Sequence, residues 1–195
     1  AGIKHLTVNK AGLDVKDLDT LASQSVPGSN GVVVLPFFNG ERTPNLPNGR
    51  ASITGLTVAN SSRTNICRAA MEAAIFGMRG GLDAFRSLGF KPREIRLIGG
   101  GSKSKPWRQI AADVLNLPVK VPMLDEAAAL GAAIQALWCL EQSSPNGKTI
   151  AQLCADHIQM DESAVAMPIA ENVKLYNDAY AVYMKNLEAV MPLYK

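Results

Sequence analysis

The sequence has little histidine or cysteine, with two histidines and three cysteines among 195 residues. His5 and His157 stand alone, so neither a zinc site nor a histidine-based catalytic triad can be assembled from them. The cysteines Cys67, Cys139 and Cys154 have no metal-like spacing, and their odd number leaves one without a disulfide partner. We therefore expect no metal site and reduced thiols, as in a cytoplasmic protein.

Strong charge of one sign and long hydrophobic runs are also absent. The net charge is only +3, and the lysines and arginines are scattered, which argues against a nucleic-acid partner. The longest apolar stretch, residues 127–140, is too short and too rich in alanine to cross a bilayer, and no secretory signal pattern opens the chain. The sequence thus predicts a cytoplasmic globular protein that binds neither membrane nor nucleic acid.

Apolar periodicity and turn residues divide the chain into helices and strands. Residues 36–57 contain three prolines and are expected to form a long ordered loop. Asp125 is expected to cap the helix that follows it. The expected helices are 1–24, 62–88, 106–115, 126–140, 150–155 and 170–190, and the expected strands are 32–35, 95–98 and 119–121.

This order of elements predicts an α/β fold with helices packed on a mixed sheet. Three strands are too few for an independent sheet of usual size, so we expect preceding strands outside this chain to complete it. Residues 1–142 are assigned to this domain, and residues 143–195 to a helical C-terminal extension packed on it.

The expected helix 62–88 is apolar on two sides, so it is predicted to lie buried between layers. The pairs Arg68–Glu72 and Arg79–Asp83 are expected on its remaining polar edge, each contributing only a few tenths of a kcal/mol. The tyrosines of the last helix repeat every three or four residues and are expected to pack against the main body.

The segment IRLIGGGSKSKPWR, residues 95–108, carries the strongest functional signal. An apolar strand ends at three consecutive glycines, and a helix follows after a cationic turn. Glycines let backbone approach a ligand closely, and a helix N-terminus offers free N–H groups to an anion. The spacing fits neither the dinucleotide fingerprint nor the P-loop. The pattern is typical both of an actin-type ATPase and of a plain tight turn.

Several segments, in order, resemble motifs of one family, the FGGY carbohydrate kinases. Ala73 stands where that family usually has glycine. The resemblance covers most of residues 31–141, and the ordered set is far more specific than any single piece. The matching segments are LPFFNGERTP at 35–44, GLT at 55–57, RAAMEA at 68–73, GGGSKS at 99–104, WRQ at 107–109, AD at 112–113 and LGAA at 130–133.

The resemblance implies part of a ribonuclease H-like, actin-type ATP-binding domain. It also implies transfer of the ATP γ-phosphoryl group to a ketose, with D-xylulose favoured, and Mg²⁺ on the nucleotide. The catalytic aspartate and most sugar contacts would come from an N-terminal domain, so no catalytic residue is assigned and the fragment alone is expected to be inactive. The cofactor-binding residues implied are Gly99, Gly100 and Gly101, of which Gly100 and Gly101 pass beneath the phosphates and ribose, with Ser102, Ser104 and Lys105 beside the adenine.

Several alternatives stay open. A family member acting on glycerol, gluconate or ribulose would share the ATP half, whereas a non-catalytic interaction domain would bind nothing at the glycine turn. The oligomeric state is open, with a homodimer as one option. For Lys105, a solvated charge at the start of a helix is an alternative to direct nucleotide contact. Trp107 and Asp113 are expected to have structural roles. Glu41 and Arg42 are expected to pin their loop, the alternative being a place near the substrate or the N-terminal domain.

Overall fold

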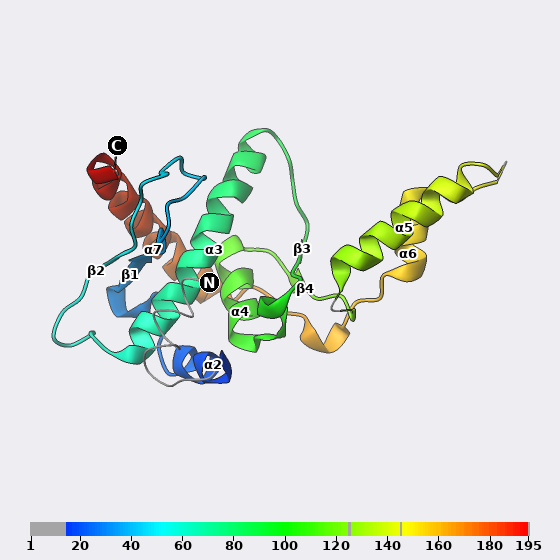
Figure 1. The fold of residues 1–195 in the computed structure, drawn as a ribbon. Helices are drawn as coiled ribbons and strands as arrows, with labels where there is room; N and C mark the ends of the chain where they lie inside the picture. The colour runs from blue at the N-terminus through cyan, green and yellow to red at the C-terminus, as the bar shows by residue number, and fades with distance from the viewer. Residues whose placement is uncertain (1–14, 125, 145, 195) are drawn as a thin grey trace.

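The computed structural model describes residues 15–124, 126–144 and 146–194 (Figure 1). Its helices are α2 (Val15–Ser23), α3 (Arg63–Ser87), α4 (Lys105–Leu115), α5 (Ala127–Glu141), α6 (Ile150–His157) and α7 (Ala170–Val190). Its strands are β1 (Val33–Leu35), β2 (Ser52–Thr54), β3 (Ile95–Arg96) and β4 (Val119–Lys120). Short 3-10 turns are η1 (Ser29–Gly31), η2 (Gly100–Lys103), η3 (Glu162–Ala164) and η4 (Met191–Tyr194).

Five of the six expected helices are confirmed to within two residues at each end, as α3 to α7. The helix expected over residues 1–24 is described only where α2 lies, and its first 14 residues are outside the described part. Asp125, the expected helix cap, also lies outside the described residues. Local periodicity and turn residues were therefore sufficient to predict α3 to α7.

Helix α3 forms the centre of the core. The Ser62 hydroxyl accepts a hydrogen bond from the N–H of Asn65 at 3.2 Å and caps its N-terminus. The first half is buried against α2, α4 and β1. The second half is not, since Met78 and Phe85 are 52% and 60% exposed. The prediction of a helix buried between layers is wrong there: Arg79 and Arg86 bond to α4 and α7, but the apolar side chains of Met78 and Phe85 stay exposed.

The strands form two separate pairs. β1 and β2 are antiparallel, with Val34 opposite Ile53, and β1 is buried beside α3 and α7. β3 and β4 are parallel, with Ile95 opposite Val119. β2 lies inside the segment predicted as a loop, because three residues are too few to show alternation and only the pairing with β1 makes them a strand. The expected sheet is thus present in two pieces within the described residues.

The C-terminal third divides between two places. Helices α5 and α6 pack on each other and project from the main body, whereas α7 returns to lie along α3, α4 and β1 (Figure 1). Tyr176 and Tyr183 are buried, and the ring of Phe76 lies 5.2 Å from that of Tyr183. The predicted packing of the tyrosine stripe is confirmed, while the domain boundary at residue 142 stays a prediction. Across the described ranges, no helix is long and apolar enough to cross a membrane.

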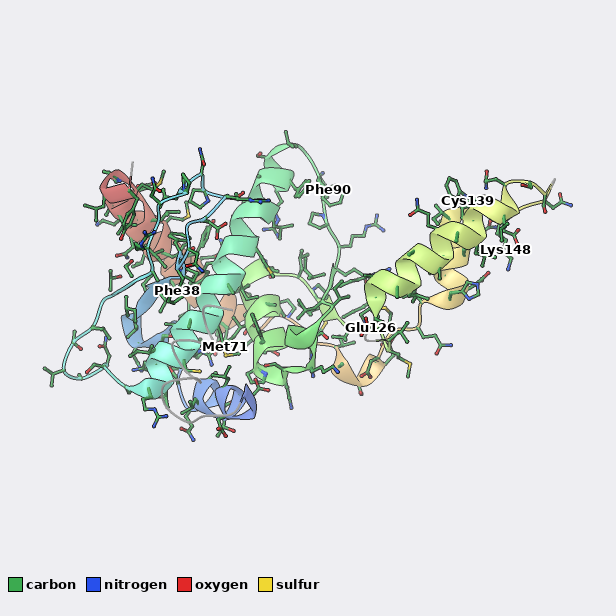
Figure 2. The ribbon with its side chains drawn as sticks, viewed as in Figure 1. Phe38, Met71, Phe90, Glu126, Cys139 and Lys148 are labelled. Carbon is green, nitrogen blue, oxygen red and sulfur yellow. The ribbon has the colours of Figure 1, made fainter. Side chains whose placement is uncertain are left out.

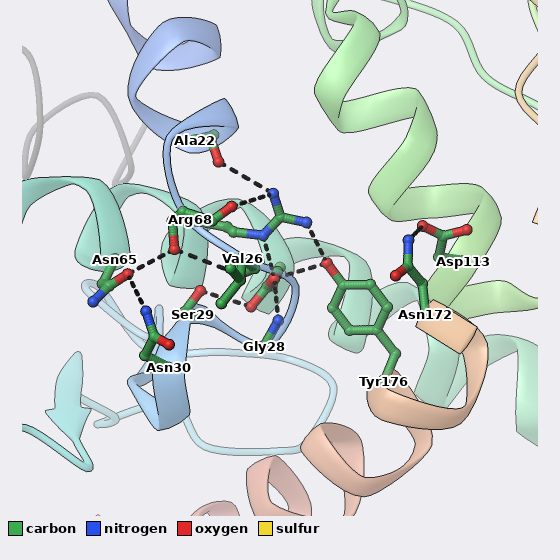
Figure 3. A network of polar contacts seen from close by, with 12 residues as sticks. Ala22, Val26, Gly28, Ser29, Asn30, Asn65, Arg68, Asp113, Asn172 and Tyr176 are labelled. Carbon is green, nitrogen blue, oxygen red and sulfur yellow. Dashed lines mark hydrogen bonds and ion pairs between the residues drawn. The ribbon is translucent and has the colours of Figure 1, made fainter. Parts of the chain in front are cut away.

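A buried polar network joins the end of α2 to α3 and α7 (Figure 3). Glu72, only 2% exposed, accepts hydrogen bonds from the Gly28 N–H at 2.9 Å and the Ser29 hydroxyl at 2.8 Å. It also accepts from Arg68 Nε at 2.9 Å and the Tyr176 hydroxyl at 2.8 Å. Burial, with Glu72 adding to it, raises the pKa of Tyr176, so its hydroxyl stays protonated and can donate.

The prediction that Arg68 and Glu72 lie on a polar helix edge is therefore wrong. Arg68 is 9% exposed and donates to the carbonyls of Ala22 and Ser25, both at 3.1 Å. Its Nη2 donates to the Tyr176 hydroxyl at 2.8 Å. The Arg68–Glu72 pair lies at the centre of the contact between α2, α3 and α7, because the end of α2 and the side of α7 cover this face of α3.

Candidate functional site

The glycine turn leads from β3 into α4 through η2. Gly99 has φ +79° and ψ −171°, a conformation that only glycine adopts readily. The N–H and the hydroxyl of Ser102 both donate to the Gly99 carbonyl, at 3.0 and 2.7 Å. A Cβ built on Gly99 or Gly100 would meet no atom within 4 Å. This stretch of backbone therefore leaves room for a ligand to approach closely.

Helix α4 begins where this turn ends, and its N-terminus is capped. The Ser104 hydroxyl accepts from the N–H of Trp107 at 3.1 Å and donates to Asp19 Oδ1 at 2.6 Å. Pro106 occupies the first turn, where its missing N–H has no helical partner to lose. The Trp107 ring lies against Gly101, whose added Cβ would come within 3.1 Å of it. Trp107 thus packs against the turn, as predicted, and Ser104 ties α4 to α2.

A hollow of about 280 Å³ opens beside the turn. It is lined by Ser102, Lys103 and Arg108, and from the segment before α7 by Asp161 and Ser163. Hydrogen bonds from Ser163 to Asp161, together with the nearby Arg108 charge, hold the pKa of Asp161 below its usual range. Two cations, one carboxylate and several hydrogen-bonding groups make this hollow suited to a polar or anionic ligand.

A second hollow of about 470 Å³ adjoins the first, because Arg108 and Ser163 line both. Lys105 and Gln109 of α4 contribute to its wall. The exposed, positively charged Lys105 is the first residue of α4, where the helix dipole also favours negative charge. The start of α4 therefore combines two sources of positive potential.

The six residues predicted to bind a nucleotide lie together in this one turn. Gly99 and Gly100 expose open backbone, and Ser102 and Lys105 line the two hollows. Gly101 packs against Trp107, and Ser104 caps α4 and bonds to Asp19. Their contact with a nucleotide stays a prediction.

Asp161 and Ser163 were missed by the sequence analysis. They belong to a segment without a recognisable motif, and they reach the hollow because Val119 of β4 pairs with Ala166. The N–H of Val119 donates to the Ala166 carbonyl, and the N–H of Ala166 to the Val119 carbonyl, both at 2.9 Å. No local signal in the sequence predicts this pairing.

The loop that carries Glu41 and Arg42 is fixed by its own hydrogen bonds. The Glu41 carboxylate accepts from the N–H of Arg42 at 2.7 Å and of Thr43 at 3.4 Å. The backbones of Glu41 and Leu46 exchange two hydrogen bonds of 2.9 Å. These contacts support the predicted structural role of Glu41. Arg42 borders a separate exposed hollow of about 550 Å³, so its alternative place near a substrate stays open.

Asp113 has a structural role, as predicted. Its side chain is buried, and it accepts hydrogen bonds from Gln109 Nε2 at 2.9 Å, the Ile169 N–H at 2.8 Å and Asn172 Nδ2 at 2.9 Å. Ile169 precedes the first residue of α7. The carboxylate therefore holds the start of α7 against α4.

Comparison with known proteins identifies a family. The profile of the C-terminal domain of the FGGY family of carbohydrate kinases matches residues 4–140. A xylulose kinase of Haemophilus influenzae is 49% identical over 181 residues, which are 92% of this chain and 36% of that protein. The chain therefore spans about a third of the length of this relative.

Solved structures agree with this match. The xylulose kinase of Bifidobacterium adolescentis is 36% identical with a TM-score of 0.70, covering 91% of this chain and 34% of that one. The ligand-bound xylulose kinase of Lactobacillus acidophilus has a TM-score of 0.87 at 23% identity, covering 98% and 38%, and so supports the fold alone. The chain belongs to the FGGY family of carbohydrate kinases and matches its C-terminal domain.

Proposed function

We propose that this chain is the ATP-binding part of a kinase that transfers the γ-phosphoryl group of ATP to D-xylulose, giving xylulose 5-phosphate. The observation that carries the proposal is the 49% identity to a xylulose kinase along nearly the whole chain. Because the chain spans about a third of that relative, we propose this reaction for a longer polypeptide that contains the chain. We further propose a ribonuclease H-like topology, as in actin-type ATPases, and a cytoplasmic location.

The glycine turn would hold the phosphoryl donor. Gly99 and Gly100 leave open space for the nucleotide, and the backbone of Gly101, next in the chain, would lie beneath its phosphates and ribose. Lys105 and the N-terminus of α4 supply positive potential, and Ser102 borders the adjoining hollow. Phosphoryl transfer depends mainly on positioning and charge stabilisation, which these groups offer. The general base and most sugar contacts would lie in the N-terminal part of the polypeptide.

The Mg²⁺ that accompanies ATP would be held mainly by the phosphates. Magnesium in such sites is bound through one or two carboxylates together with substrate phosphates. The part of the chain that the structure describes has no group of three or more His, Cys, Asp or Glu side chains that could hold a metal. We assign no residue of this chain as a metal ligand.

The test is phosphorylation by the longer polypeptide of D-xylulose, D-ribulose, gluconate and glycerol, each with ATP. We expect the highest kcat/KM for D-xylulose. A preference for another sugar would contradict D-xylulose as the substrate but would still support a carbohydrate kinase. Failure to bind ATP in calorimetry would instead favour a non-catalytic interaction domain. The 195-residue chain alone is expected to show no turnover of D-xylulose, since it would lack the base.

The site itself is tested by Lys105→Ala in the longer polypeptide. Loss of one charge-assisted contact to the bound nucleotide should raise KM for ATP by roughly tenfold. Lys185→Ala is the matched control, because Lys185 is an exposed lysine of α7 that lines neither hollow. Equal effects of the two substitutions would show that Lys105 is only a solvated charge.

A further inference from the structure

The side chain of Arg108 bonds back from α4 to the glycine turn. Its Nη1 donates to the carbonyl of Ser102 at 2.7 Å, a distance typical of a charge-assisted hydrogen bond. Ser102 is 5% exposed, and both its N–H and its hydroxyl donate to the Gly99 carbonyl. A chain of hydrogen bonds therefore runs from Arg108 through Ser102 to the glycine whose φ is +79°.

The position of Arg108 is unfavourable for the helix itself. Arg108 lies in the first turn of α4, where the helix dipole favours negative charge and disfavours a cation. Arg86, by contrast, lies in the last turn of α3, where a cation is favoured, and its Nη2 donates to the Leu115 carbonyl at 2.9 Å. Residues that depart from a local rule are expected at functional sites. Helix stability therefore gives no reason for arginine at position 108, whereas the bond to Ser102 does.

Two neighbours of Arg108 hold other parts of the same turn. The Ser104 hydroxyl bonds to Asp19 of α2, and the Trp107 ring lies against Gly101. Figure 2 shows α4 beside α2 and β4, both of which it contacts. The turn is thus attached at its third glycine and at the residue that caps α4, and Arg108 holds the peptide between these two points.

Arg108 also borders both hollows beside the turn, and Ser163 is the other residue that lines both. Hydrogen bonds from Ser163 hold the pKa of Asp161 below its usual range, and the Arg108 charge adds to them, so the guanidinium lies close enough to attract that carboxylate. A guanidinium has five N–H donors in a fixed planar geometry. One donor can therefore hold the turn while the charge acts on the segment that precedes α7.

We propose that Arg108 is a positioning residue of the nucleotide site, which acts through the Ser102 carbonyl to hold the glycine turn in the conformation that receives ATP. This inference rests on the proposed function, because it requires that the turn binds the nucleotide. When only a fraction of the molecules has the competent conformation, the apparent affinity is reduced by that fraction. A hydrogen bond to a charged donor shifts such an equilibrium by about tenfold or more.

The first test is the kinetics of Arg108→Met in the longer polypeptide, with ATP and D-xylulose as substrates. Methionine keeps an unbranched side chain but removes the donor and the charge. We expect KM for ATP to rise by roughly tenfold, while kcat and KM for D-xylulose change less than about twofold, because saturating ATP selects the ordered turn. Arg86→Met is the matched control, since Arg86 also bonds to a backbone carbonyl but lines neither hollow, and should leave all three constants unchanged.

The second test separates positioning from direct contact with the nucleotide. Amide hydrogen exchange is measured on the same variants without ATP, at the N–H groups of Ser102 and Ser104, which bond to carbonyls within the turn at 3.0 and 3.2 Å. Positioning predicts exchange about tenfold faster in Arg108→Met and unchanged in Arg86→Met. The N–H of Val119, which bonds to the segment before α7, should stay protected in both and reports that they are folded. Unchanged exchange at the turn would overturn the proposal, and a raised KM for ATP would then indicate direct contact.

The outcomes distinguish this inference from the proposed function. Absence of ATP binding in the wild-type polypeptide would overturn both the proposed function and the role of Arg108. ATP binding in the wild type, together with an unchanged KM for ATP in Arg108→Met, would overturn the role of Arg108 alone. If loss of protection at Val119 shows that Arg108→Met is unfolded, Arg108→Gln, which also lacks the charge, is measured in its place and should change KM for ATP and exchange at the turn in the same directions.

Discussion

Substitution of Glu72 by glutamine should destabilise the fold far more than an ordinary helix ion pair predicts. Glu72 is 2% exposed, and its carboxylate faces the Arg68 guanidinium at 2.9 Å. Glu72→Gln keeps the shape but removes the charge, so Arg68 is left buried without a counter-ion. It also places an N–H₂ group where an oxygen accepts hydrogen bonds from Gly28, Ser29 or Tyr176.

The magnitude follows from this burial. Removing one partner of a buried ion pair costs about 3 to 5 kcal/mol, because the remaining charge stays desolvated. We expect a loss of this size in the free energy of unfolding, measured by urea denaturation followed by circular dichroism. Arg68→Met combined with Glu72→Gln should cost clearly less than the sum of the two single substitutions, since the double variant leaves no uncompensated charge.

The matched control is Asp83→Asn on the same helix. Asp83 pairs with Arg79 at 3.6 Å and with Arg86 at 3.0 Å, but its side chain is 41% exposed. Exposed ion pairs contribute about 0 to 1 kcal/mol, so Asp83→Asn should lower the free energy of unfolding by less than about 1 kcal/mol. A loss for Glu72→Gln no larger than for Asp83→Asn would refute the reasoning, as would strict additivity in the double variant.

Three further predictions concern single residues and use the same unfolding measurement. Burial raises the pKa of the Cys67 thiol from 9.0 to about 11. The contribution of this thiol to the free energy of unfolding should therefore be complete below pH 9 and decrease as the pH rises toward 11. Cys67→Ala should make the free energy of unfolding depend less on pH in this range, and an unchanged pH profile would contradict the prediction. Ser104→Ala removes the cap of α4 and should cost about 1 kcal/mol, whereas Ser87→Ala, at an exposed helix end, should cost under about 0.5 kcal/mol. Gly99→Ala meets no atom but strains a φ of +79°, and should cost about 1 to 3 kcal/mol. Gly100→Ala, without positive φ and with equal space, should cost clearly less, and equal losses would exclude backbone strain as the cause.

The helices and the place of the candidate site could be predicted because their signals are local. The apolar repeat predicts α3 within one residue at each end, and the glycines before Pro106 mark the turn into α4. Neighbours three and four positions apart in sequence meet on one helix face, so a short window contains the information. The ordered motifs carried the family resemblance in the same way.

Contacts between distant segments decided the rest. The sequence shows Arg68 and Glu72 one helical turn apart, but only the approach of α2 and α7 buries them. Asp161 joins the hollow beside Arg108 only because β4 pairs with Ala166, and residues 52–54 become a strand only through β1. Sequence alone determined the helices α3 to α7 and the position of the glycine turn between β3 and α4. Tertiary structure decided which faces are buried and which remain exposed, because burial depends on what packs from elsewhere in the chain.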